Sequence, residues 1–422
     1  MILEEFGGAR GIALWRQLRS ILSWVRADGP NERRSLTSLE RTRARRRLLE
    51  PLEGPLPASL LEALLHLPPG PAARPPSEIA DACEAVAAWA EEQCGLHTAL
   101  EYRQAAALLE PDSAPRALAM FASARALAQF SRAEAWFHRV VGLSRRSSDW
   151  QVYIEAYLAH GTMVLRMGRL DQARRSFLKA LRRSRREGLH LQAGISLQRL
   201  LVADYRDGRE DRGDERGAQV LERLEDEPSH LRELAEELAF AWLDHGDHAP
   251  AARLLDGLTE RRIRPGRSGI TGSLARARAT LGDREGFRDA RLRLERLPDD
   301  LELASAWLDV AWGAVLLGDD DAMEDALARA CTVARHRWYG WIRRGAESVR
   351  RARTGELPAP ELPAPAPART ERRMELARRI LDALEGDSGP ERKMGRVSSG
   401  PVPPPTRRPG PGSDPHSRAP CG

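Results

Sequence analysis

The stretch from residue 154 to residue 180 reads IEAYLAHGTMVLRMGRLDQARRSFLKA. In its first half, apolar and small residues recur at steps of three and four, which is the spacing of one helical face: Ile154, Tyr157, Leu158, Gly161, Val164 and Leu165. Gly168 interrupts this pattern, because glycine readily adopts the positive φ that ends a helix. In the second half Ala173, Phe177 and Ala180 again share a face. The stretch therefore predicts a helical hairpin.

Glycines mark the same kind of turn at nearly regular intervals along the chain. The intervals of 40, 38, 36 and 36 residues separate Gly168, Gly208, Gly246, Gly282 and Gly318. Each glycine follows an apolar segment of helical period and precedes a short polar segment that begins another one. A period of this length is typical of stacked helical hairpins, each of which buries its apolar face only against its neighbours. The sequence predicts an all-α fold.

The quoted stretch resembles the tetratricopeptide repeat (TPR). The residues that match the structural positions of that repeat are Tyr157, Gly161, Gly168, Ala173, Phe177 and Ala180. A similar pattern occurs 40 residues upstream, where Phe137 corresponds to Phe177, and looser patterns follow downstream. After Gly208 we expect a charged insertion over residues 209–217. The resemblance implies a right-handed α-solenoid of antiparallel helix pairs, whose small residues let the paired helices approach closely.

Composition divides the chain into three regions. Residues 1–70 are expected to form an arginine-rich helical module, with prolines between Pro68 and Pro76 as a linker. The TPR-like array is expected over residues 77–354. Residues 355–422 contain 14 of the 29 prolines and are expected to be largely disordered. A short helix near residues 370–385 is expected within this tail, as a docking segment or, by preference, as a transient helix.

The location of the protein is inferred from absences in the sequence. No run of about 18 apolar residues occurs, so we expect no transmembrane segment. The amphipathic stretch from Gly11 to Arg26 could lie on a membrane surface, but we expect it to pack against the body of the protein or against another subunit. The first residues lack the features of a signal peptide, and the four cysteines lack metal-ligand spacing. We expect a cytoplasmic protein, and a bacterial one because arginine greatly outnumbers lysine.

Motifs of catalysis and metal binding are not found in the sequence. It contains no P-loop, no H-E-x-x-H and no G-x-S-x-G motif. The turn Asp244-His245-Gly246-Asp247-His248 has ligand-type side chains, but polar residues are also usual where one helix ends and the next begins. Asp319, Asp320 and Asp321 are interpreted as residues that cap a helix. We expect no enzyme activity, no cofactor and no metal.

Basic residues form clusters whose role the sequence leaves open. Arginines and one lysine crowd the second helix of the quoted hairpin, from Arg174 to Arg186, and five arginines lie between Arg41 and Arg47. They could bind nucleic acid or an acidic protein. We favour solvated helix faces, because the net charge is only +5 and no aromatic residues interleave with the arginines.

The function that the resemblance implies is that of a protein-interaction scaffold, which binds a peptide or helix of another protein in the concave groove. In the family frame, the residues expected to line this groove are Glu155, Thr162, Arg166, Gln198, Arg199, Val202 and Arg206. Three of them, Arg166, Arg199 and Arg206, are expected to present a positive strip to an acidic or C-terminal segment. The alternative is a nucleic-acid-associated regulator that uses the arginine clusters, with the repeats as its sensor.

Overall fold

The computed structural model describes residues 2–26, 76–224, 226–260, 268–298, 302–334, 339–356 and 366–386. Its first helices are α1 (Ile2–Phe6), α2 (Gly8–Arg26), α5 (Pro76–Glu92), α6 (Leu96–Leu109), α7 (Ala114–Ala126), α8 (Phe130–Ser147), α9 (Trp150–Arg166), α10 (Leu170–Arg186) and α11 (His190–Arg206). The others are α12 (Glu210–Leu224), α13 (Pro228–Asp244), α14 (His248–Glu260), α15 (Ser268–Thr280), α16 (Arg284–Leu294), α17 (Leu303–Leu317), α18 (Asp320–Ala334), α19 (Tyr339–Arg353) and α20 (Pro367–Gly386). These described ranges contain no strand, which confirms the all-α prediction.

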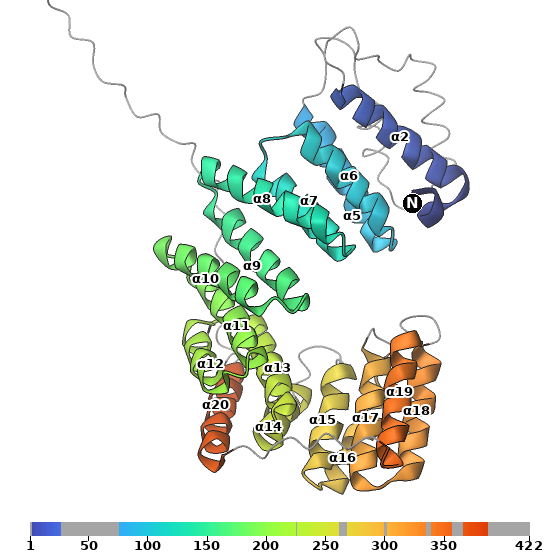
Figure 1. Ribbon diagram of the computed structural model, residues 1–422, viewed down its shortest axis with the longest axis vertical. Coiled ribbons are helices and arrows are strands. Elements are labelled where there is room, and N and C mark those ends of the chain that lie inside the picture. The colour runs from blue at the N-terminus through green and yellow to red at the C-terminus, as the bar shows by residue number, and fades with distance from the viewer. Residues whose placement is uncertain are drawn as a thin grey trace, which may run out of the picture.

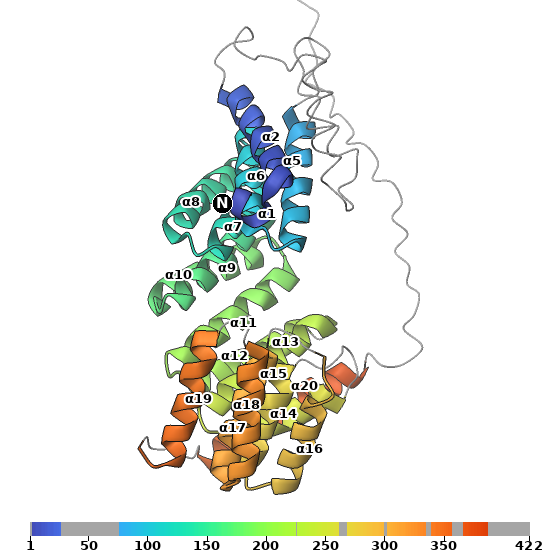
Figure 2. The same cartoon turned by 90° about the vertical axis from the view of Figure 1, so that its right-hand side faces the viewer.

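Helices α7 to α18 form six antiparallel hairpins, α7/α8 to α17/α18, arranged in two layers (Figure 1). Each first helix contacts the first helix of the next hairpin, so that α7, α9, α11, α13, α15 and α17 form a continuous layer. Among the described helices, no second helix contacts another second helix in this series. The first helices therefore lie on the inside of a curved stack and the second helices on the outside (Figures 1 and 2). This confirms the predicted TPR-like α-solenoid.

The turns explain the regular spacing of the glycines. Gly168, Gly208, Gly246, Gly282 and Gly318 all have φ values between 68° and 80°. Side chains other than glycine rarely adopt this conformation, which ends the first helix of each hairpin. The repeat length of the sequence is therefore the distance between one such turn and the next.

The hairpin α9/α10 shows how the two helices come together. Phe177 is fully buried, and a Cβ atom at Gly161 would overlap its aromatic ring. Ala173 and Ala180, one turn to either side of Phe177, are also fully buried. Tyr157 is buried on the facing helix. The ring thus fills the space that three small residues leave open.

The next hairpin differs from the prediction. Residues 209–217 are not an insertion, because all but Arg209 belong to the continuous helix α12. Gly213 lies against the ring of Tyr205, and Gly217 lies near Leu201. Gly217 stands 40 residues after Phe177, and Leu201 stands 40 residues after Gly161. The large and the small residue have exchanged helices, so these glycines serve packing and do not end the helix.

The described part of the N-terminal module packs against the beginning of the array. Leu14, Leu18 and Ile21 of α2 are buried in a core that they share with α5 and α6. The hydroxyl of Tyr102 on α6 donates a hydrogen bond of 2.9 Å to the backbone oxygen of Leu14. The helix expected from Gly11 to Arg26 thus packs against the body, as predicted. The rest of residues 1–70 and the expected linker lie outside the described residues.

The helix in the tail is docked, so the preference for a transient helix was wrong. Helix α20 packs against α12, α13 and α14 (Figure 1). Ala377 and Ile380 are fully buried in this contact. Composition suggested too small an apolar face, but the contact also includes a buried arginine, Arg373, with carboxylate partners. The remainder of the predicted disordered tail lies outside the described residues.

Across the described segments, no helix combines the length and the apolar character that crossing a membrane requires.

Replacing Phe177 with Ala should lower the free energy of unfolding by roughly 3–5 kcal/mol, because the emptied site is lined by small residues that cannot collapse into it. Urea denaturation followed by circular dichroism measures the change. Phe240→Ala is the matched control, because Phe240 is 37% exposed, and it should change stability by less than about 1 kcal/mol. Equal effects of the two substitutions would contradict the packing role of Phe177.

Candidate partner-binding surface

Three arginines from successive first-layer helices lie close together. Arg125 is near the end of α7, Arg166 is the last residue of α9, and Arg199 is in α11. Burial lowers the pKa of Arg125, and the positive charges of Arg166 and Arg199 lower this pKa further. A positive charge lowers the pKa of a neighbouring arginine only at short range. We call Arg125, Arg166 and Arg199 the inner arginine cluster.

Within the described part of the chain, no carboxylate neutralises the charge of Arg125. Its Nε atom is buried and has no hydrogen-bond partner there. No described carboxylate lies within ion-pair distance of Arg125 or of Arg166, which is exposed at the end of its helix. Burying a charge without a partner is unfavourable. Groups in such surroundings are more common at functional sites than elsewhere.

Arg199 has a partner on the next first-layer helix. Its guanidinium donates a hydrogen bond of 2.6 Å to a carboxylate oxygen of Glu237 in α13. Burial raises the pKa of Glu237, whereas Arg199 lowers it. The inner arginine cluster therefore has one neutralised member and two members without a carboxylate in the described structure. The uncompensated charge is concentrated on Arg125 and Arg166.

Gln198 cannot line a groove, and its predicted role as a contact residue was wrong. Its side chain is completely buried. The side chain of Arg199, the next residue of the helix, is by contrast 33% exposed. Val202, a turn after Gln198, is half-buried and packs against the main core. Of these predicted positions on α11, Arg199 is thus better placed than Gln198 to meet a ligand.

The remaining predicted residues are accessible to different degrees. Glu155 is exposed and accepts a hydrogen bond of 3.2 Å from Gln151 of the same helix. The hydroxyl of Thr162 donates to the backbone oxygen of Leu158 at 2.9 Å. Arg206 is exposed at the end of α11, and within the described residues no contact joins it to the inner arginine cluster. Their part in a groove stays a prediction.

Arg125 was not predicted, and its hairpin lacks the glycine that marks the others. At the corresponding turn Ala128 has a φ of 54°. The glycine period therefore did not extend to α7. Phe137, which corresponds to Phe177, already extended the repeat frame upstream, but the residue 40 positions before Arg166 is Ala126, so the frame did not point to Arg125.

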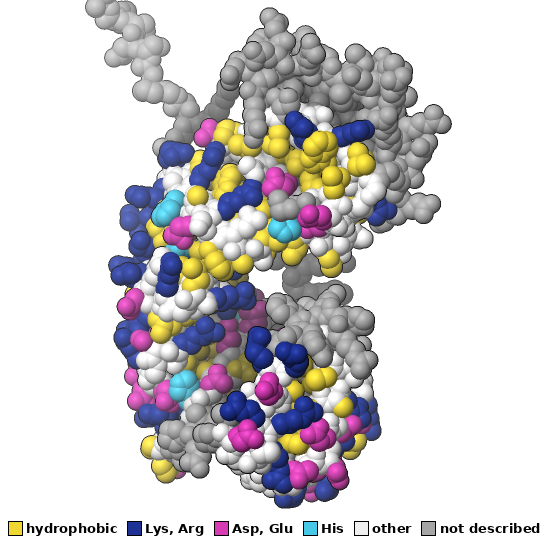
Figure 3. All heavy atoms as spheres, turned by 45° about the vertical axis from the view of Figure 1, so that its right-hand side comes forward, with side chains coloured by type: hydrophobic (Ala, Val, Ile, Leu, Met, Phe, Trp, Pro, Cys, Tyr) yellow, Lys and Arg dark blue, Asp and Glu magenta, His cyan; other side chains and the backbone are white. Residues whose placement is uncertain are grey.

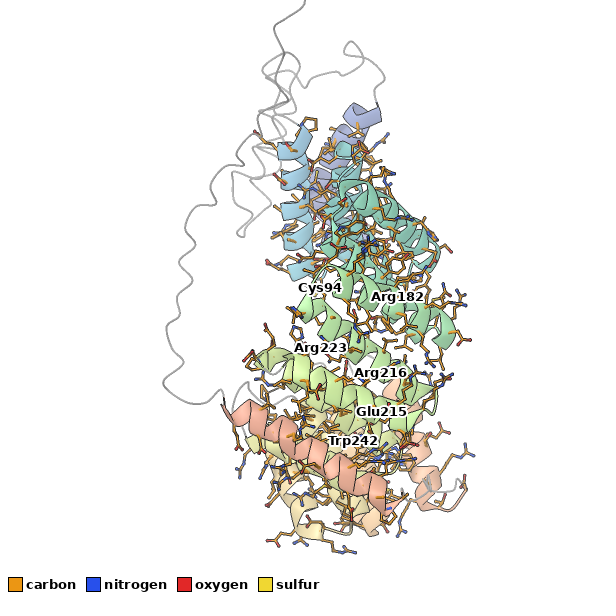
Figure 4. All side chains as sticks on the ribbon, turned by 90° about the vertical axis from the view of Figure 1, so that its left-hand side faces the viewer. Cys94, Arg182, Glu215, Arg216, Arg223 and Trp242 are labelled. Atoms are coloured by element: carbon orange, nitrogen blue, oxygen red, sulfur yellow. The ribbon has the colours of Figure 1, made fainter. Side chains whose placement is uncertain are left out.

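The basic residues of the outer layer are partly engaged within the array. Arg174 pairs with Asp204 at 3.0 Å and with Asp207 at 2.8 Å, both from the following hairpin. The guanidinium of Arg183 lies 3.6 Å from the centre of the Trp150 ring. Lys and Arg side chains gather along the left edge of the molecule in Figure 3. Figure 4 labels Arg182, which belongs to α10 as Arg174 and Arg183 do. Arg174 and Arg183 thus support the structure. The exposed members fit the predicted solvated helix face: Arg175, Lys179, Arg182, Arg185 and Arg186.

The turn that carries ligand-type residues binds a guanidinium. Asp247 is buried and accepts hydrogen bonds from Thr370 at 3.1 Å and from Arg373 at 3.3 Å, both in α20. Among the described residues, no group of three or more His, Cys, Asp or Glu side chains is arranged to hold a metal ion. In the later turn Asp319 accepts a hydrogen bond of 3.0 Å from the backbone nitrogen of Ala322, as the capping interpretation predicted.

Paired helices, the close approach of Gly161 to Phe177 and the positive-φ turns define the architecture. The chain is a TPR-like helical-repeat protein. No family model matches it, and a search of curated proteins finds no match.

Solved structures align with this chain, and three of them have TM-scores below 0.5. PilF from Pseudomonas aeruginosa is matched over 98% of its chain and 55% of this one, with 17% identity and a TM-score of 0.40. A Rap protein complexed with competence and sporulation factor is matched over 99% and 79%, with 10% identity and a TM-score of 0.45. The TPR domain of P58(IPK) is matched over 98% and 72%, with 14% identity and a TM-score of 0.22. At these identities the likeness concerns the fold alone.

A serine, a histidine and a glutamate form a chain of polar contacts inside the TPR-like array. Nδ1 of His160 is 2.9 Å from the Ser176 hydroxyl, and Nε2 is 3.2 Å from a carboxylate oxygen of Glu134. The same order occurs in hydrolases. Here Ser176 is only 5% exposed within a packed hairpin, and His160 stacks on Phe137. We interpret the group as a structural network that joins α8, α9 and α10.

Replacing Arg125 with Met should increase the free energy of unfolding by about 0.5–1 kcal/mol, because it removes a half-buried charge that has no carboxylate partner and keeps the apolar stem. Thermal denaturation measures the change. Arg166→Met is the control, because Arg166 is exposed, and it should change stability by less than about 0.5 kcal/mol. A clear loss of stability in Arg125→Met would show that Arg125 has a structural partner.

The His160 network should make stability depend on pH. Burial lowers the pKa of His160, while Glu134 raises it and His138 and Lys179 lower it further. As the pH falls through about 6.5, the unfolded chain therefore takes up the proton first, and the folded state loses stability until the lowered pKa is passed. Urea midpoints at about pH 7.5 and pH 5.5 should differ more for the wild type than for His160→Gln. The same pH dependence in both proteins would contradict this.

Proposed function

We propose that this protein is a protein-interaction scaffold whose inner layer binds an acidic segment of a partner protein. The observation that carries the proposal is the charge of Arg125, which is half-buried beside Arg166 and Arg199 and has no described carboxylate partner. An acidic ligand would relieve the repulsion between these groups. Arginine also binds carboxylates through two parallel hydrogen bonds, which a lone ammonium group cannot form.

The spacing of the helices suggests the spacing of the acidic residues. Packed helices lie about 8–10 Å apart, and a chain in the polyproline II conformation has three residues per turn and rises about 3.1 Å per residue. Arginines on neighbouring first-layer helices therefore match carboxylates that are three residues apart in a polyproline II segment, because these lie on one face of it. The proposed ligand carries acidic residues in the pattern acid-x-x-acid and crosses α7 and α9. Glu155 and Thr162, also on α9, remain proposed neighbours of such a segment.

A fluorescent peptide with Glu at every third position should bind the wild-type protein more tightly than a peptide of the same composition with consecutive Glu residues. Arg125→Gln combined with Arg166→Gln should weaken this binding at least about tenfold, because each charge-assisted hydrogen bond contributes about 1.5–3 kcal/mol. Fluorescence anisotropy at two salt concentrations measures both effects. The matched control is Arg182→Gln with Arg186→Gln on the outer layer, which should bind as the wild type does.

The same assay separates the proposal from the nucleic-acid alternative. Random-sequence duplex DNA should bind the wild type more weakly than the spaced acidic peptide does. Tighter binding of DNA, with a steep salt dependence and a loss in the outer-layer control, would overturn the proposal. Equal binding of the two peptides would refute the acid-x-x-acid pattern but leave an acidic ligand in place.

A further inference from the structure

Helix α20 lies on the outer face of the array, far from the helix that precedes it in the chain. It contacts α12, α13 and α14 in the middle of the array, whereas α19 packs on α17 and α18 at its end. Figures 1 and 2 show this separation, and in Figure 4 the helix runs across the outer side of the array. The array thus has a groove on α12, α13 and α14 that accepts a helix from outside the repeat series. We call it the outer groove.

The outer groove contains a pocket of carboxylates that buries the guanidinium group of Arg373, and one of these acids, Glu210, also pairs with Arg369 at 3.0 Å. Arg373 of α20 is completely buried, and three carboxylates surround it. Its nitrogens lie 2.9 Å from Glu210, 3.0 Å from Asp214 and 3.3 Å from Asp247. All three acids belong to the hairpins of the array. Without a cation between them they would repel one another, so this pocket requires a positively charged group.

The floor of the pocket is built by the array itself. Trp242 donates from its indole nitrogen to the hydroxyl of Tyr205 at 2.7 Å and to Asp214 at 3.1 Å. Tyr205 also donates to Asp214. These bonds orient the Asp214 carboxylate without any contribution from α20. The acceptor is therefore positioned in advance of its ligand.

Two glycines make room for the leucines of α20. A Cβ atom at Gly217 would lie 3.1 Å from Leu376, and one at Gly257 would overlap Leu381. Gly217 occupies the position that Phe177 holds in the preceding hairpin. In the α11/α12 hairpin, Leu376 of α20 thus packs over a site where the array lacks a large side chain of its own. The carboxylate pocket and the two glycine sites that receive leucines both fit a helix that is not part of the repeats.

The opposite face of α20 satisfies its own charges. Arg378 pairs with Glu375 at 2.6 Å and with Asp382 at 3.0 Å, in the same helix. Such pairs at spacings of three and four support an isolated helix. Only one face of α20 therefore depends on the array.

We propose that the outer groove is a second binding site of this protein, for an amphipathic helix that carries an arginine, and that α20 is its intramolecular occupant. The pattern that the groove accepts is an arginine followed by apolar residues 3, 4, 7, 8 and 11 positions later, as in Arg373, Leu376, Ala377, Ile380, Leu381 and Leu384. A partner helix with this pattern binds when α20 leaves. The inference does not depend on the acidic ligand of the inner layer.

Competition with a synthetic copy of α20 tests the proposal on the full-length protein. The probe is a fluorescent peptide of residues 366–386. In the wild type the tethered α20 has an effective concentration in the millimolar range, so the probe should bind weakly. Arg373→Glu adds a fourth carboxylate to the pocket and should eject α20 from the groove. The apparent affinity for the probe should then rise at least about tenfold, because the competent fraction of the protein increases.

Two controls match this experiment. Arg379→Glu changes an exposed arginine of the same helix that has no ion pair among the described residues, and it should leave probe binding as in the wild type. A probe in which Arg373 is replaced by Gln should lose the affinity that the Arg373→Glu protein has gained. A folded Arg373→Glu protein that gains no affinity would overturn the proposal.

If the Arg373→Glu protein does not fold, hydrogen exchange of the wild-type protein tests the proposal instead. Amides of α20 that exchange faster than those of α12 and α14 would support a detachable occupant. Equal protection of α20, α12 and α14 would show that α20 is an integral part of the fold and would overturn the proposal.

Discussion

Paired helices of this protein pack closely because a large side chain on one helix lies against a glycine on the other. Phe177 is completely buried against Gly161, with no room for a single methyl group between them. The close approach lets each first helix pack on the next, and the second helices are left outside the curve. An inner and an outer surface follow from this one constraint. In the next hairpin the exchange of large and small residues, Leu201 and Gly217, keeps the packing but opens the outer side to Leu376 of α20.

Arginine serves two opposite purposes in the array. Arg373 is buried among three carboxylates, and Arg174 bridges two aspartates of the following hairpin, so both contribute to the fold. Arg125 is half-buried beside other arginines and lacks a described carboxylate partner. Charges that are paired stabilise the structure or leave it unchanged, whereas an unpaired charge in a partly buried position makes it less stable. The difference in pairing separates structural arginines from candidates for binding, which residue counts cannot do.

The sequence was sufficient for the repeat architecture, because helical period and turn glycines are local properties. It was insufficient where a residue's surroundings come from distant segments. The docking of α20 depends on acids that lie more than 120 positions earlier, such as Asp247, so composition alone suggested a transient helix. The interior glycines of α12 look like turn residues until their packing partners are known. Gln198 was misplaced because its complete burial depends on how the neighbouring helices pack. Arg125 was missed because the 40-residue repeat places Ala126, and not Arg125, at the position of Arg166.

The inner and outer surfaces differ in the charge of the ligand that each would accept. The inner arginine cluster would repel a basic helix such as α20, and the carboxylates around Arg373 would repel an acidic segment. The two surfaces nevertheless share their supporting helices. Helix α11 carries Arg199 on one side and Tyr205 beneath the guanidinium pocket, while α13 carries Glu237 and Trp242 in the matching positions. Opposite charge keeps the two proposed ligands from competing for one site, while a common pair of helices supports both.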